Sequence, residues 1–208
     1  MATATAGCAA TAAGADLPRT AASAAPVNGP AVQQLAELRV APRGAMTGYT
    51  DKQFPHWISQ GHNCDTREVV LQRDGRDVRV DKNCHPVAGT WTSPYDGETW
   101  TNSSDVDIDH VVPRAQAWVS GAAAWMLQRR TDFANDLTRP ELLAVTDNLN
   151  QQKRDLAPDQ WKPPLVSYWC TYATDWITVK HFYSLTITTA EKTALTDMLG
   201  HCPKAGTR

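Results

Sequence analysis

The sequence lacks long hydrophobic runs, a strong net charge and several common enzyme motifs. None of its 208 residues lies in a stretch approaching the roughly 18 consecutive apolar residues that a membrane-spanning helix requires, so we expect no membrane span. The formal net charge is -2, so contact with a polyanion would depend on a local patch or a bound cation. The HExxH, GxSxG and phosphate-binding glycine-loop patterns are missing as well. Zinc protease, serine hydrolase and nucleoside-triphosphatase functions therefore lack support.

Residues 1–30 contain few large apolar side chains. They are dominated by Ala, Thr, Gly and Pro, which cannot bury enough surface to offset the entropy of ordering, so we predict a disordered leader or the remnant of a signal region. Ala22-Ser-Ala24 resembles a signal-peptidase site, although the basic region and leucine-rich run that would precede it are missing. Cys8 is interpreted as a leftover residue of this leader. Residues 31–208 predict a single domain.

The cysteines show none of the CxxC spacing that indicates zinc or redox chemistry. Setting Cys8 aside leaves an even number, Cys64, Cys84, Cys170 and Cys202. Two structural disulfides are the natural interpretation, and they favour an oxidising compartment and therefore secretion. The alternative is a cytosolic protein with four reduced cysteines in its core.

Two local patterns suggest how these cysteines pair. Residues 68–80 are rich in apolar residues on both sides of Asp74-Gly75, which predicts a β-hairpin with Cys64 opposite Cys84 at its open end. Near the end of the chain, apolar residues at helical spacing predict two helices that a Cys170–Cys202 bridge would tie together. Thr188 and Glu191 have capping-box spacing, so the second helix should begin there.

In the middle of the chain, residues 105–113 alternate acidic and apolar side chains. This pattern predicts a strand with Val106 and Ile108 on its core face and three carboxylates on the other. An EF-hand loop is rejected, because the positions that need Gly and Glu hold His110 and Gln116.

Three further segments follow this strand. Residues 114–130 are mostly strong helix formers and predict a packing helix, and residues 141–146 predict a short buried strand. Thr146 or Asp147 can then cap a polar helix that carries Asn150. The resulting order of strand, helix, strand and polar helix is that of a ββα-metal finger.

The motifs on these segments resemble those of the HNH endonuclease family. Asp107-Ile-Asp109-His110-Val-Val-Pro113 is similar to its Asp-x-Asp-His-(Ile/Val)-Val-Pro signature, and Asn150-Gln-Gln-Lys153-Arg-Asp155 is similar to its Asn-x-x-Lys-x-Asp helix. The likeness is closest to secreted bacterial HNH nucleases. It implies an α+β fold, with a ββα-metal core at about residues 104–158 embedded in a mainly helical domain that has an N-terminal β-hairpin and disulfide-tied C-terminal helices.

The resemblance also implies roles for individual residues. His110 would be the general base, and Asp109 and Asn150 would be oxygen ligands of one divalent cation. A carboxylate and an amide leave positions for water and phosphate oxygens, which suits Mg²⁺, with Mn²⁺ or another divalent cation as a substitute.

The remaining site residues are assigned less directly. The family's middle asparagine helps to orient the catalytic histidine; the register places Glu141 near that position, whereas Asn135, which we prefer, lies farther upstream. We count Asn135 and Arg67 with the catalytic residues and expect Glu141 near the substrate. Arg67 and Lys153 are candidates for holding phosphate, with solvated surface charges as the alternative for each.

Together these features predict a secreted, metal-dependent endonuclease that acts on DNA, with RNA as a further candidate, at low sequence specificity. We expect a monomer; whether a protein inhibitor exists is left open. One alternative is a disulfide-stabilised extracellular binding module without catalysis, whose partner surface would come from Trp91, Trp100, Trp161, Trp169 and Trp176. Another is the cytosolic nuclease domain of a restriction system, which would carry free thiols.

Overall fold

A computed structural model describes Met1 and residues 29–203 of the chain. The predictions about a disordered leader, a processing site and Cys8 therefore concern residues outside the described range, apart from Gly29 and Pro30, which begin the first helix. The structure is a mixed α+β fold whose small sheets are all antiparallel. Within the described residues, no helix is long and apolar enough to cross a membrane.

Helices and strands are interspersed along the chain. They are α1 (Gly29–Glu37), η1 (Asp51–Gln53), β1 (Ser59–Gly61), β2 (Cys64–Asp65), α2 (Thr66–Asp74), β3 (Arg76–Val80), β4 (Pro86–Thr92), β5 (Thr99–Trp100), η2 (Ser103–Asp105), β6 (Val106–His110), α3 (Arg114–Val119), η3 (Ala122–Ala124), α4 (Leu127–Ala134), β7 (Leu142–Thr146), α5 (Asp147–Lys153), η4 (Val166–Tyr168), α6 (Trp169–Tyr183) and α7 (Thr189–Leu199).

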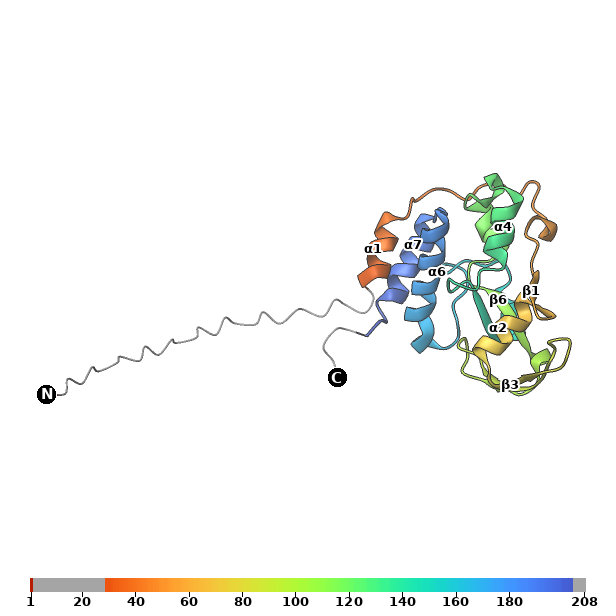
Figure 1. Cartoon of the computed structure of the whole chain (residues 1–208). Helices are drawn as coiled ribbons and strands as arrows, with labels where there is room; N and C mark the ends of the chain where they lie inside the picture. Colours follow the sequence, from red (N-terminus) through yellow and green to blue (C-terminus); the bar gives the residue numbers. More distant parts are fainter. Residues whose placement is uncertain (2–28, 204–208) are drawn as a thin grey trace.

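Helices α1, α6 and α7 pack side by side and form one half of the molecule (Figure 1). Their contact is built on fully or nearly fully buried apolar side chains, among them Leu35, Ile177 and Leu195. The Cys170–Cys202 disulfide joins the start of α6 to the chain just beyond α7, so the predicted pairing is confirmed. The capping box at Thr188 and Glu191 is confirmed too, since each side chain accepts a hydrogen bond from the other residue's backbone amide.

The predicted hairpin about Asp74-Gly75 is wrong. Residues 66–74 form α2, because Asp65 accepts a hydrogen bond from the Glu68 amide at 2.9 Å and the Glu68 carboxylate accepts one from the Asp65 amide at 2.8 Å, a capping box that fixes a helix start. The real hairpin is one element later, where β3 pairs with β4. The Cys64–Cys84 disulfide does form, but it joins the residue before this cap to the β3–β4 turn.

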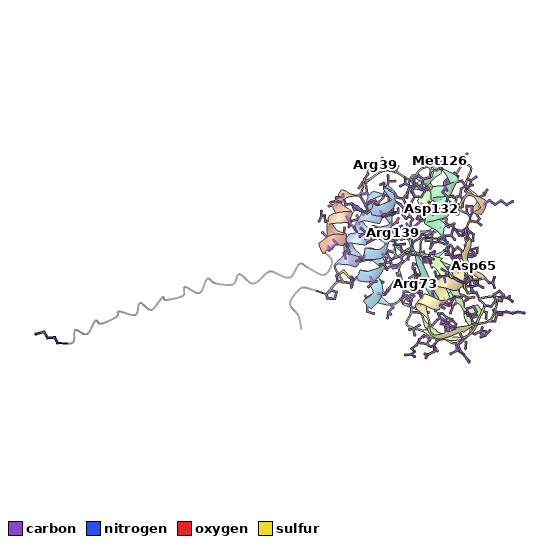
Figure 2. All side chains as sticks on the ribbon, in the orientation of Figure 1. Arg39, Asp65, Arg73, Met126, Asp132 and Arg139 are labelled. Atoms are coloured by element: carbon purple, nitrogen blue, oxygen red, sulfur yellow. A yellow bond between two sulfur atoms is a disulfide. The ribbon has the colours of Figure 1, made fainter. Side chains whose placement is uncertain are left out.

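Strands β6 and β7 form an antiparallel ribbon in continuous register, from Val106 opposite Thr146 to His110 opposite Leu142. The predicted core face is confirmed: Val106 and Ile108 are buried against α2 and β4. Figure 2 labels Asp65 and Arg73, which lie near the two ends of α2. Arg73 donates a hydrogen bond to the Leu142 carbonyl at 2.5 Å and thereby fastens the end of this helix to β7.

The single helix predicted for residues 114–130 is interrupted. Gly121 has a backbone φ of 130°, which an L side chain rarely adopts, and the chain turns there between α3 and η3 before α4 begins. By contrast, the predicted short strand and the polar helix after it are confirmed as β7 and α5.

The tryptophans proposed as a partner surface do not form one. Trp91 and Trp176 are buried in the two hydrophobic clusters, with 2% and 0% of their surface exposed. Trp100, Trp161 and Trp169 are half-buried and pack against those clusters. All five tryptophans thus pack in or against the hydrophobic clusters, and the binding-module alternative loses its main support.

Candidate active site

Strand β6 and helix α5 face each other through two pairs of polar side chains. Asp107 accepts a hydrogen bond from the Asn150 side-chain amide at 3.2 Å. One turn further along α5, the Lys153 ammonium lies 2.7 Å from one oxygen of Asp109 and 2.9 Å from the other. The pairing follows from the two periodicities, because alternate strand residues share a face and so do helix residues three positions apart.

The Asp109 carboxylate is buried, with 4% of its surface exposed. Besides Lys153, it accepts a hydrogen bond from the Tyr95 hydroxyl at 2.5 Å. Burial raises the pKa of Asp109 above its usual range, and the neighbouring Lys153 charge and the two hydrogen bonds oppose that rise. A carboxylate has about four lone-pair positions, so three bonds leave room for one further partner.

His110 lies at the end of β6 with its ring held on two sides. Its Nε2 lies 3.0 Å from the Ala134 carbonyl oxygen, and its ring stacks on the Trp57 indole with centroids 5.6 Å apart and planes 24° apart. A carbonyl can only accept, so Nε2 carries the hydrogen, and in the neutral ring Nδ1 is left as the acceptor. Burial lowers the pKa of His110 to about 3, with the nearby Arg114 charge acting in the same direction. The ring is therefore neutral at physiological pH.

The loop that carries Trp57 is fastened by Asn135. The Asn135 amide donates to the Pro55 carbonyl at 2.8 Å, and its side-chain oxygen accepts from the Ile58 amide at 3.2 Å. Thr66 donates to the same oxygen at 2.7 Å. Trp57, between these anchors, has a φ of 56°, a conformation that is unfavourable for a bulky side chain and persists only where the surroundings enforce it.

A cleft of about 310 Å³ opens along this part of the ribbon. Its wall combines the histidine and the carboxylates with arginines and one tryptophan: Trp57, Arg67, Asp107, Ile108, Asp109, His110, Pro113, Arg114, Asn150, Arg154 and Asp155. Arg67 is oriented by hydrogen bonds to the Ser103 and Val106 carbonyls, both at 3.0 Å. Arg114 lies 2.7 Å from His56 and also approaches Asp51. The cleft thus places guanidinium groups around a neutral imidazole, a composition suited to a phosphate.

The structure brings four of the predicted site residues together at this cleft: Arg67, Asp109, His110 and Asn150. Asn135 lies behind the cleft wall, where it holds the Trp57 loop, and the Ala134 carbonyl takes the role of fixing the His110 ring.

Glu141 and Lys153, predicted to bind substrate, are both completely buried. Glu141 accepts a hydrogen bond from the Val112 amide at 3.0 Å, and burial raises its pKa well above the usual range. Lys153 points at Asp109 and at the His110 carbonyl. Neither side chain has exposed surface to offer a substrate.

Sequence reasoning gave no site role to four other residues of the cleft, namely Trp57, Arg114, Arg154 and Asp155, although Asp155 ends the Asn-x-x-Lys-x-Asp motif. Asp107 was recognised as one of three aligned carboxylates and as the first residue of the motif around His110, but it was given no role in the site. Nothing local in the sequence marks Trp57, because it reaches His110 from a loop far earlier in the chain.

The acidic groups at the cleft are few. Across the part of the chain that the structure describes, no three His, Cys, Asp or Glu side chains gather as a metal-binding group. Asp107, Asp109 and Asn150 nevertheless lie on the facing sides of β6 and α5 and line the cleft together. Carboxylate and amide oxygens are the donors that hard divalent cations prefer, and a site with few protein ligands suits a cation that keeps several waters.

Comparison with known proteins gives two matches. Residues 66–198 match the family model described as GmrSD restriction endonucleases, C-terminal domain. The chain is also 58% identical over 168 residues to an uncharacterized secreted protein of Arthroderma benhamiae, an alignment that covers 81% of this chain and 82% of that protein. No solved structure matches. The matched family region contains β6, β7, α5 and every cleft residue except Trp57.

Proposed function

Since the chain belongs to the family of the C-terminal domain of GmrSD restriction endonucleases, an HNH-like nuclease family, we propose that it is a secreted, metal-dependent endonuclease. Its substrate would be DNA, with RNA as a second candidate, cleaved at low sequence specificity. The observation that carries the proposal is the His110 ring, whose Nε2 is bound to the Ala134 carbonyl while Nδ1 remains as an acceptor, in a cleft lined by three carboxylates and three arginines.

In this proposal His110 acts as the general base. Nδ1 takes a proton from a water molecule while the water oxygen forms a bond to phosphorus and the bond from phosphorus to the leaving sugar oxygen breaks. The low pKa keeps Nδ1 unprotonated at neutral pH, so that its lone pair is available to the attacking water. The negative charge that accumulates on phosphate beside the ring offsets the cost of forming a buried imidazolium.

The cleft arginines hold the phosphate. Arg67 is fixed by two backbone carbonyls, which limits the entropy lost when it binds an anion. Arg114 and Arg154 lie on the same wall and offer further donors.

The donor set fits a divalent cation such as Mg²⁺ or Mn²⁺. Asp109 and Asn150 would hold it, with the Asp107 carboxylate adjacent. When bound, the cation would stabilise negative charge on the reacting phosphate. The residues of the chain do the remaining work of placing the water, the base and the phosphate.

A secreted enzyme agrees with two disulfide bonds and with a relative described as secreted. The disulfides also count against a cytosolic restriction nuclease with free thiols.

Plasmid cleavage tests the proposal. We expect purified wild type to nick and linearise plasmid with Mg²⁺ or Mn²⁺ and to lose activity with excess chelator. His110→Ala should reduce the rate by a factor on the order of 10³ or more while leaving the far-UV spectrum unchanged. His85→Ala is the matched control, because His85 is exposed in the β3–β4 turn. A folded wild type without activity under every condition would refute the nuclease proposal.

A further inference from the structure

Lys153 is a buried cation inside the candidate active site. Its side chain has no exposed surface, and its ammonium group binds both oxygens of Asp109 and the backbone carbonyl of His110 at 2.9 Å. It therefore contacts the carboxylate assigned to the metal and the backbone of the assigned base at the same time. Because Lys153 lies behind the cleft wall, these contacts are unavailable to substrate.

The position of Lys153 matters because Asp109 is also buried. A buried carboxylate without a compensating charge is strongly destabilising, and the Tyr95 hydroxyl supplies a hydrogen bond but no charge. Lys153 is the side chain that supplies the positive charge within bonding distance of Asp109. The same ammonium holds the last residue of β6, so the end of the strand and the carboxylate are fixed together.

We propose that Lys153 is a positioning residue that acts as an internal cation. It neutralises the Asp109 carboxylate and orders the end of β6 in the metal-free protein. Its positive charge also weakens the binding of a divalent cation at Asp109. This inference rests on the proposed metal-dependent function. It assigns Lys153 a role different from phosphate binding.

Two consequences separate this role from a purely structural one. Without Lys153 the metal-free protein should be less stable, because Asp109 is then buried without a partner charge. An added divalent cation should restore part of that stability, because Asp109 is free to bind it and no ammonium repels it. A lysine that only filled space would show the first effect without the second.

The chain offers a matched control. Lys180 is also completely buried, and its ammonium lies 2.6 Å from the buried Glu191 carboxylate. This pair lies in the α6–α7 half of the molecule, away from the cleft. Lys180→Met thus removes a buried charge of the same kind without touching the candidate metal site.

The experiment measures thermal unfolding by circular dichroism for wild type, Lys153→Met and Lys180→Met, each in chelator and over a series of MgCl2 and MnCl2 concentrations. In chelator we expect both variants to melt about 10 °C lower than wild type. Cation should then raise the Tm of Lys153→Met by at least about twice the wild-type rise, with half-saturation at about tenfold lower Mn²⁺. Lys180→Met should show the wild-type rise.

If the cations shift the Tm of wild type and of Lys153→Met equally, or shift neither, the inference is overturned. If Lys153→Met does not fold, Lys153→Gln takes its place, because glutamine keeps N–H donors without the charge. Plasmid cleavage by the same wild-type sample separates the two proposals: cleavage together with equal shifts refutes only the role of Lys153, whereas inactive, folded wild type refutes the nuclease function.

Discussion

The His110 imidazole stacks on the Trp57 indole, with ring centroids 5.6 Å apart and planes 24° apart. The contact joins the end of β6 to a loop whose tryptophan has a φ of 56°. Unfavourable backbone conformations cluster at functional sites, and this one lies next to the candidate base. The stack and the Ala134 carbonyl together leave the ring little freedom to rotate.

Trp57→Ala should therefore impair catalysis more than folding. Loss of the stack lets the His110 ring leave its position, and a displacement of about 1 Å can cost about 10²-fold in rate. We expect kcat for plasmid cleavage to fall by about 10- to 100-fold with a small change in Tm. Trp57→Phe should recover much of the rate because it restores an aromatic face. Unchanged kcat in Trp57→Ala would show that the stack does not orient the base.

Asn135→Ala should affect both stability and rate. The side chain makes four hydrogen bonds, to Pro55, Ile58, Thr66 and Thr131, and removing it leaves several of these groups without a partner. The expected loss in free energy of unfolding is about 2–4 kcal/mol, measured by urea denaturation. Cleavage should also slow at a temperature where the variant is fully folded, because the Trp57 loop is released. A destabilised variant with wild-type kcat would confine Asn135 to a structural role.

Asp175 predicts a pH dependence of stability. Burial raises its pKa to about 7, partly opposed by a hydrogen bond from Tyr168. The folded state then binds the proton more tightly than the unfolded state, whose pKa is about 3.9. The contribution of Asp175 to stability is consequently highest below about pH 4 and is lost as pH rises through 7.

Asp175→Asn removes this titration. The free energy of unfolding of the variant minus that of wild type should increase by about 2 kcal/mol from pH 5 to pH 8. Urea denaturation at both pH values measures this difference. Asp197→Asn is a suitable control, because Asp197 is exposed and pairs with Lys162. If the stability of Asp175→Asn relative to wild type does not increase with pH, the raised pKa of Asp175 is contradicted.

Each of the two disulfides should contribute independently to the free energy of unfolding. The cysteines are 20 and 32 residues apart, and for loops of this size chain entropy predicts a contribution of about 3–4 kcal/mol each. Replacing both cysteines of one pair with serine tests each bridge by urea denaturation. The Cys64–Cys84 variant should in addition lose cleavage activity, because this bridge holds the start of α2, which carries Arg67. Mass spectrometry showing free thiols at Cys64, Cys84, Cys170 and Cys202 in the purified wild type would refute both bridges.

The sequence by itself determined the features that depend on neighbouring residues. Alternation in residues 105–113 predicted β6 and its core face, and Thr188 with Glu191 predicted the start of α7. An even number of cysteines predicted two bridges, and the order of strand, strand and helix around Asp109, His110 and Asn150 was correct. The hairpin prediction failed although its signal is also local, because the Asp65–Glu68 capping box started a helix through the same residues.

Only the tertiary structure decided which side chains reach the cleft. Lys153 meets Asp109 across 44 residues of sequence, and Asn135 meets Pro55 across 80. Such contacts depend on how separate elements pack, and the pattern within one segment does not predict that packing. The tertiary structure therefore decided that Lys153 points at Asp109, that Glu141 is buried and that Trp57 stacks on His110. Each of these features depends on surfaces built by distant parts of the chain.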